Sequence, residues 1–135
     1  MKKEIIFQNK MEEVTRIAAF IDEIGEELEL DFSLLTSIQL AIEEAVVNVI
    51  EYAYPDNVEG QNSLSVQKKG NTIIFVLSDS GTPFDPTAAA APDLSLSAED
   101  RPIGGLGIML VKKIMNEVTY QRIDGKNELT MKKNI

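Results

Sequence analysis

Cysteine and histidine are both absent from the 135 residues of this chain. Without cysteine, the chain can form no disulfide framework, no thiolate nucleophile and no zinc–thiolate site. Without histidine, it lacks the commonest general base of enzymes and cannot carry a phosphohistidine. The lack of cysteine is compatible with a reducing compartment, and we expect a cytoplasmic protein.

Long apolar runs and an excess of positive charge are missing as well. The longest clear apolar run, residues 73–77, is far shorter than the ~20 residues of a membrane-spanning helix. The apolar stretch after the first lysines, residues 5–7, is too short for a secretory signal, so we expect none. The formal net charge is −9, and a negative field repels a phosphate backbone. We therefore expect neither a membrane segment nor direct contact with nucleic acid.

The length and composition are those of one ordinary globular domain. Hydrophobic residues make up 44% of the chain and charged residues 26%, and no internal repeat or linker divides it. We expect a single domain over residues 1–135.

The periodicity of apolar residues predicts the order strand, helix, helix, two strands, long irregular segment, helix, two strands. The expected ranges are 4–8, 11–28, 31–53, 63–68, 72–77, 106–115, 118–122 and 128–131. Asp31 and Ser33 are candidate N-caps of the second helix. Gly70 and the pair Asp124–Gly125 indicate tight turns between strands. The prediction is an α+β fold, a two-layer α/β sandwich with three main helices packed on a mixed, mainly antiparallel sheet.

The second predicted helix carries a carboxylate and an amide in the segment LAIEEAVVNVIEYAYP. Glu44 and Asn48 lie one turn apart beside the apolar face, whereas Glu43 points away from Asn48. The Asn48 carbonyl oxygen can bind a hard divalent cation, and Glu44 can accept a proton from a hydroxyl. Taken alone, this spacing is more often an ordinary solvated helix edge.

A second signal, DSGTPFDP at residues 79–86, follows the predicted buried strand. Asp79 at the strand end can accept a hydrogen bond from an exocyclic amine, and Gly81 lets a flat ring approach the backbone. Because Asp, Ser, Gly and Pro are all turn formers, a simple turn is the competing explanation.

A third signal, IGGLGIMLVKKIM, opens the last helix after the irregular segment 82–103. Backbone N–H groups at Gly104, Gly105 and Gly107 can cradle phosphates, aided by the helix dipole. The segment is neither a dinucleotide fingerprint nor a P-loop. A flexible loop that meets a helix is the alternative. The length of the irregular segment indicates a functional or mobile loop.

Together, and in this order, the three signals resemble those of the GHKL ATPases, the family of DNA gyrase, MutL and histidine kinases. The finer resemblance is to the bacterial anti-sigma-factor serine/threonine kinases. EEAVVNVIEYAYP is similar to their N box, DSGTPFDP to their G1 box and GGLGIMLVKKIMNEV to their G2 box. The run Phe84–Asp85–Pro86 is the most branch-specific feature. The resemblance extends from about residue 4 to residue 132 and implies the Bergerat ATP-binding fold.

The resemblance also implies roles for the residues at matching positions. Asn48 would hold the Mg²⁺ that bridges the ATP phosphates, and Glu44 would activate the attacking hydroxyl. Asp79 would bind the adenine amine, with Gly81 beneath the ring.

At the other end of the nucleotide, the resemblance implies a lid over the phosphates, formed by Gly104, Gly105 and Gly107. Arg101, just before these glycines, is a candidate for neutralising phosphate charge. One departure is Tyr52, at a position where many relatives carry histidine.

Two functions remain open. The first is an ATP-dependent serine/threonine protein kinase that sequesters a sigma factor and phosphorylates a STAS-type antagonist, usually as a homodimer. The second is a nucleotide-dependent binding module of the same fold with little or no kinase activity. Glu44 favours the kinase, because a pure binder needs no base. A complete histidine kinase needs an acceptor histidine, and gyrase-like and MutL-like ATPases need a second domain, so we set these functions aside.

Overall fold

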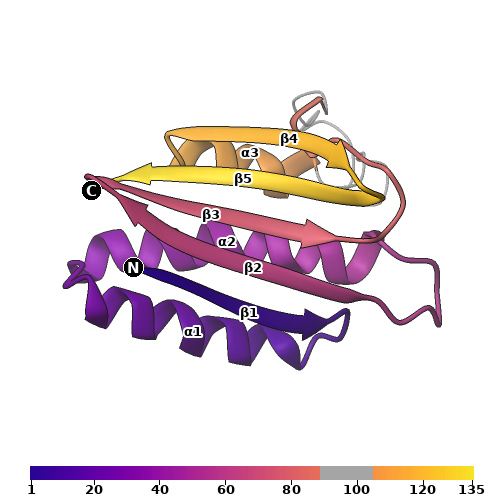
Figure 1. Ribbon diagram of the computed structural model, residues 1–135, viewed down its shortest axis with the longest axis horizontal. Helices are drawn as coiled ribbons and strands as arrows, with labels where there is room; N and C mark the ends of the chain where they lie inside the picture. The colour runs from indigo at the N-terminus through magenta and orange to yellow at the C-terminus, as the bar shows by residue number, and fades with distance from the viewer. Residues whose placement is uncertain (89–104) are drawn as a thin grey trace.

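A computed structural model describes residues 1–88 and 105–135, except for the side chains of 105 and 106. The described part contains three α-helices, five strands and one turn of 3-10 helix (Figure 1). In chain order these are β1 (Lys2–Gln8), α1 (Glu13–Glu27), α2 (Phe32–Tyr52), β2 (Gln61–Lys69), β3 (Thr72–Asp79), η1 (Pro86–Ala88), α3 (Gly105–Ile114), β4 (Glu117–Ile123) and β5 (Lys126–Asn134). The order of elements predicted from the sequence is confirmed.

The strands form one sheet in the order β1-β2-β3-β5-β4, and each of its four pairings is antiparallel. The predicted two-layer α+β sandwich is confirmed, with a sheet that is antiparallel throughout the described pairings where we predicted a mixed one. Both turn predictions are also confirmed. Asp124 and Gly125 have φ of 51° and 76°, which is typical of a type I′ hairpin turn. Gly70 has φ of 59° between β2 and β3.

The three helices cover one face of the sheet, where α1 contacts β1, α2 contacts β3 and α3 contacts β4 (Figure 1). Side chains alternate along each strand, so every second residue of β2, β3 and β5 is buried against the helices. The core consists mainly of aliphatic side chains and two phenylalanines, among them Phe7, Ile17, Ile42, Val46, Leu64, Ile73, Phe75 and Met131. At one end of this face, Asp79 of β3 pairs with Asn127 of β5, and both are buried although polar.

α2 is the central helix of the layer. It begins after Asp31, whose side chain caps the helix by accepting the Leu34 N–H at 2.8 Å, as predicted. By length and composition alone, α2 could cross a membrane. Its apolar residues are instead part of the core, namely Ile38, Ala41, Ile42, Ala45, Val46, Val49 and Ile50. A core helix of a globular domain therefore accounts for its hydropathy.

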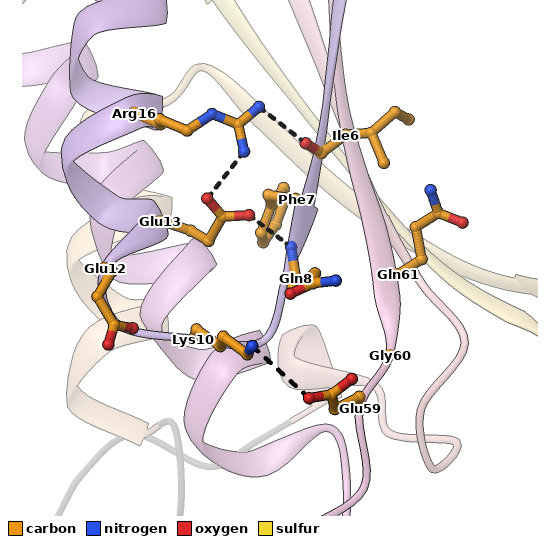
Figure 2. A pocket seen from close by; sticks show the side chains of 10 residues that line it. All are labelled: Ile6, Phe7, Gln8, Lys10, Glu12, Glu13, Arg16, Glu59, Gly60 and Gln61. Carbon is orange, nitrogen blue, oxygen red and sulfur yellow. Dashed lines mark hydrogen bonds and ion pairs between the residues drawn. The ribbon is translucent and has the colours of Figure 1, made fainter.

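The free edge of β1 is partly covered by two side chains of α1 (Figure 2). Arg16 donates to the Ile6 carbonyl at 3.1 Å and to Glu13 Oε1 at 2.8 Å. Glu13 Oε2 accepts the Gln8 N–H at 2.8 Å. These contacts satisfy backbone groups that an edge strand would otherwise offer to another strand.

Candidate functional site

A cavity of about 260 Å³ lies between the helices and the end of the sheet where Asp79 and Asn127 meet. Its apolar walls come from α2, β3, α3 and β5, through Ala45, Val49, Leu77, Ile108 and Leu129. Asn48 and Asp79, two of the residues predicted for a site, both line it. A mainly apolar cavity with a few convergent polar groups is the usual form of a small-molecule site.

Asp79 is held in place through one of its two carboxylate oxygens. It is only 6% exposed, and its Oδ1 accepts the Gly81 N–H and the Asn127 Nδ2–H, each at 2.9 Å. Within the described part of the chain, no hydrogen-bond donor lies on Oδ2. The carboxylate is thus oriented by the protein and keeps an oxygen that can accept a hydrogen bond from a ligand.

Asn127 orients Asp79 and was not among the predicted site residues. Besides Asp79, its Nδ2 donates to the Thr82 carbonyl at 2.9 Å. Its Oδ1 accepts the Tyr120 hydroxyl and the Phe84 N–H. The sequence contains one signal that could have found it. Leu129 and Met131 face the core, so the alternation of a strand places Asn127 on the same face as a buried polar residue.

Glu44 and Asn48 meet the first turn of α3 at Gly107. A Cβ added to Gly107 would lie 3.1 Å from Glu44 Oε2 and 3.5 Å from Asn48 Nδ2. The helix pair and the glycine-rich segment, predicted as separate signals, are therefore brought together at one place. A side chain at this position would therefore push the Glu44 carboxylate aside by a few tenths of an ångström.

The other residues of the glycine-rich segment are less completely described. Gly105 is the first residue of α3, whereas Arg101 and Gly104 lie outside the described residues. Their roles over the phosphates stay predictions, as do those of most of the segment 82–103.

Gly81 packs against the end of α2. A Cβ at this position would lie 2.2 Å from the Ala53 carbonyl oxygen, which also accepts the Thr82 N–H at 2.8 Å. Arg122 of β4 donates to the Gly81 carbonyl at 2.9 Å. We predicted that Gly81 would lie beneath the flat ring of a ligand, and this contact stays a prediction. The structure shows a second reason for glycine, because a side chain at this position would clash with the Ala53 carbonyl.

The Phe84–Asp85–Pro86 run closes one side of the cavity. Phe84 and Pro86 line it, and the Phe84 N–H is held by Asn127 at 3.3 Å. Asp85 Oδ1 accepts the Thr87 N–H and hydroxyl at 2.9 and 2.6 Å, which stabilises the turn η1. Lys112 of α3 then donates to the Thr87 carbonyl at 2.8 Å. The run thereby ties the Asp79 loop to α3. Tyr52, where many relatives carry histidine, also lines the cavity and is 49% exposed.

The described residues contain no cluster of three acidic, histidine or cysteine side chains that could hold a metal ion. Asn48 is the predicted metal ligand. A cation bound there would need most of its oxygen ligands from a bound molecule and from water, which is how Mg²⁺ usually binds with nucleotide phosphates.

Over residues 7–133 the sequence matches the family described as the histidine kinase-like ATPase domain. The chain belongs to this family. The predicted membership of the GHKL superfamily is confirmed, and the similar proteins place the chain in the anti-sigma-factor kinase branch.

Three similar proteins illustrate this branch. The chain is 30% identical over 95 residues to the serine/threonine-protein kinase BtrW of Bordetella bronchiseptica, covering 70% of this chain and 67% of that protein. It is 28% identical over 136 residues to the anti-sigma F factor of Clostridium kluyveri, covering 98% and 92%. It is 24% identical over 135 residues to the serine-protein kinase RsbW of Bacillus cereus, covering 97% and 84%.

A solved structure shares the fold. It contains the RsbU and RsbW domains of a Mycobacterium tuberculosis protein, with a TM-score of 0.71 and 17% sequence identity. The match covers 99% of this chain but only 32% of that one, so this chain spans about a third of the solved chain. This likeness supports the two-layer sandwich.

Proposed function

We propose that this chain binds Mg-ATP in the cavity and transfers the γ-phosphate to a serine or threonine of a STAS-type antagonist protein. Unphosphorylated antagonist would compete with a sigma factor that the chain otherwise sequesters. One observation carries the proposal: Asp79 and Asn48 line the same cavity, and Asn48 lies together with Glu44 beside Gly107. The names of the similar proteins, two kinases and an anti-sigma factor, support it.

Asp79 would recognise the adenine. Its Oδ2 would accept a hydrogen from the exocyclic amine, because Oδ1 already has two protein donors. The apolar walls at Val49, Leu77 and Leu129 would lie against the faces of the ring. Guanine carries a carbonyl where adenine carries the amine, so it would place one acceptor against another.

Asn48 and Glu44 would act at the phosphate end. The Asn48 carbonyl oxygen would bind Mg²⁺, which supplies positive charge to the triphosphate. Glu44, one turn earlier on α2, would take the proton of the attacking hydroxyl. The new bond joins the hydroxyl oxygen to the γ-phosphorus, the bond from that phosphorus to the β–γ bridging oxygen breaks, and ADP leaves with the electron pair. Gly107 fits this role because a Cβ would crowd the Glu44 carboxylate.

Several further features complete the proposal. Gly104, Gly105 and Arg101 would contact the phosphates, and the protein would act in the cytoplasm as a homodimer. The net charge of −9 agrees with protein partners and disfavours nucleic acid. The competing function, a nucleotide-dependent binding module without kinase activity, gives no reason for a carboxylate beside Asn48 and Gly107.

A phosphotransfer assay separates the two functions. The protein is incubated with Mg²⁺, γ-labelled ATP and each STAS protein of the same genome, and the labelled residue is identified. We expect label on one serine or threonine of one STAS protein. ATP binding without transfer to any STAS protein would favour the binding module, and a failure to bind ATP in calorimetry would contradict both functions.

A further inference from the structure

The residues after Asp79 are attached to the end of α2 by three consecutive contacts. The Ser80 N–H donates to the Tyr54 hydroxyl at 2.9 Å, and the Thr82 N–H donates to the Ala53 carbonyl at 2.8 Å. Between them, Gly81 lies so close to Ala53 that a Cβ would be 2.2 Å from the carbonyl oxygen. The Asp79 loop and the C-terminal end of α2 therefore form one packed unit.

Tyr54 is itself fixed from the opposite side. Its hydroxyl donates to Asn62 Oδ1 of β2 at 2.6 Å, and Asn62 is 2% exposed. The Tyr54 ring rests on the backbone of Gly60, where a Cβ would lie 2.1 Å from a ring carbon. Gly60 is held in turn, because its N–H donates to Asn9 Oδ1 at 2.8 Å. The hydroxyl thus acts as a donor and an acceptor between two fixed groups, and phenylalanine could do neither.

We propose that Tyr54 is a positioning residue for base recognition, because its hydroxyl holds Ser80 and thereby sets the place of the Asp79 carboxylate relative to Asn48. Asn48 belongs to α2, and Tyr54 lies two residues beyond the end of that helix. Asp79 belongs to β3 and is the direct neighbour of Ser80. The hydrogen bond from Ser80 to Tyr54 therefore links the element that bears the metal ligand to the element that bears the adenine acceptor. This inference rests on the proposed function.

The protonation state of Tyr54 fits this role. Burial raises the pKa of the Tyr54 hydroxyl above its ordinary value, the Ser80 N–H opposes this, and the charge of Asp79 adds a smaller increase. The folded state therefore favours the protonated hydroxyl that donates to Asn62. This contribution is complete below the ordinary pKa of tyrosine and is lost as the pH rises through the higher folded value. At neutral pH the hydroxyl can serve both partners.

The test compares ATP with purine riboside triphosphate, which lacks the amine that Asp79 would bind. The discrimination ratio is the Kd of purine riboside triphosphate divided by the Kd of ATP, both measured by calorimetry with Mg²⁺. It is compared between the wild type, Tyr54→Phe, Asp79→Asn and the double variant. We expect the wild type to prefer ATP by about tenfold, the scale of one hydrogen bond to a charged group. Tyr54→Phe should lower the ratio by about threefold or more, and it should add little to Asp79→Asn, because the two changes act on one contact. At saturating ATP, the kcat of phosphotransfer should stay within about twofold, since Glu44 and Asn48 keep their places.

Asn62→Ala separates positioning from stability. The Asn62 Nδ2 atom is buried and has no hydrogen-bond partner among the described residues. Tyr54→Phe removes the hydroxyl that donates to Asn62 Oδ1, so it would leave the whole Asn62 side-chain amide without a partner among these residues and lower stability. Asn62→Ala removes that amide but keeps the hydroxyl that holds Ser80. It should lower the melting temperature, and it should lower the discrimination ratio less than Tyr54→Phe does, because Ser80 keeps its acceptor.

The outcomes distinguish the two proposals. A wild type without discrimination, or an Asp79→Asn variant with the wild-type ratio, would overturn the adenine assignment and the role of Tyr54 with it. A reduced ratio in Asp79→Asn beside a wild-type ratio in Tyr54→Phe would overturn only the role of Tyr54. The same holds if Asn62→Ala lowers the ratio as much as Tyr54→Phe does, because general loosening would then explain both.

Discussion

The surroundings of Asp79 and of the Glu44–Asn48 pair differ in how far the described residues satisfy their polar groups. Around Asp79, hydrogen bonds join the buried residues Asp79, Asn127 and Gly81, and Asn127 also donates to the carbonyl of the exposed Thr82. In the pair, by contrast, neither Glu44 nor Asn48 makes a side-chain hydrogen bond or ion pair to another described residue, and both lie against Gly107. Recognition of the adenine amine requires a hydrogen-bond acceptor in a fixed place, and the fold must supply it. A metal and phosphates bring their own charges, so the side chains that would meet them need no partner from the described residues.

Glu44→Gln should have the largest effect, because it removes the base and preserves the shape of the side chain. Phosphotransfer should fall by about a hundredfold or more, the usual scale for loss of a general base, while ATP affinity is retained. Single-turnover transfer and calorimetry measure the two quantities. Glu43→Gln is the matched control and should behave as the wild type. A Glu44→Gln variant with the wild-type rate would show that Glu44 is not the base.

Asp79→Asn should lower ATP affinity by about tenfold to a hundredfold, because an oriented acceptor is replaced by an amide that can present a donor. GTP should bind poorly to the wild type. The difference between the affinities for ATP and GTP should be smaller in the variant. Calorimetry with both nucleotides measures this change. Equal affinities of the wild type for ATP and GTP would contradict recognition of the adenine amine.

Gly107→Ala tests the contact between α3 and the Glu44–Asn48 pair. The added methyl would lie 3.1 Å from Glu44 Oε2, so the carboxylate must shift. We expect Mg-ATP affinity or the transfer rate to fall by about tenfold, because catalytic groups depend on their placement. Alanine favours a helix over glycine by about 1 kcal/mol, so the melting temperature should not fall. Met109→Ala, at an exposed position of the same helix, serves as the control. A Gly107→Ala variant with the wild-type Mg-ATP affinity and transfer rate would show that the contact between α3 and Glu44 does not matter for the site.

Glu13 lies outside the cavity and should have the smallest effect. Its hydrogen bond from Gln8, and then its pairing with Arg16, hold the pKa of the Glu13 carboxyl below its usual value. A lowered folded pKa gives stability that is present above the unfolded pKa and is lost as the pH falls through the folded value. Glu13→Gln should therefore destabilise the protein at pH 7 by less than about 1 kcal/mol, as for a partly exposed pair.

Denaturant unfolding from pH 7 down through the Glu13 titration measures this effect. The difference between Glu13→Gln and the wild type should shrink as the pH falls. ATP affinity should remain unchanged in this variant. A loss of ATP affinity in Glu13→Gln would show that the edge of β1 is coupled to the cavity.

Features that depend on neighbours along the chain could be predicted from the sequence. The one-turn spacing of Glu44 and Asn48, the cap at Asp31 and the turn at Asp124–Gly125 all follow from local backbone geometry. The ends of the strands were less predictable. β5 runs over Lys126–Asn134, beyond the predicted range 128–131, because pairing with β3 and β4 extends the strand into polar residues of low β-propensity.

The sequence by itself determined the order of elements, the apolar faces and the residue types that nucleotide chemistry needs. Only the tertiary structure decided that Asn127 orients Asp79 across 48 residues and that Gly107 meets Glu44. It also decided that Gly81 must be glycine because of the Ala53 carbonyl, and that Tyr54 holds the loop after Asp79. Periodicity and turn chemistry act within a few residues, so the sequence shows them directly. Strand register and helix packing arise from the whole core at once, and no local pattern carries them.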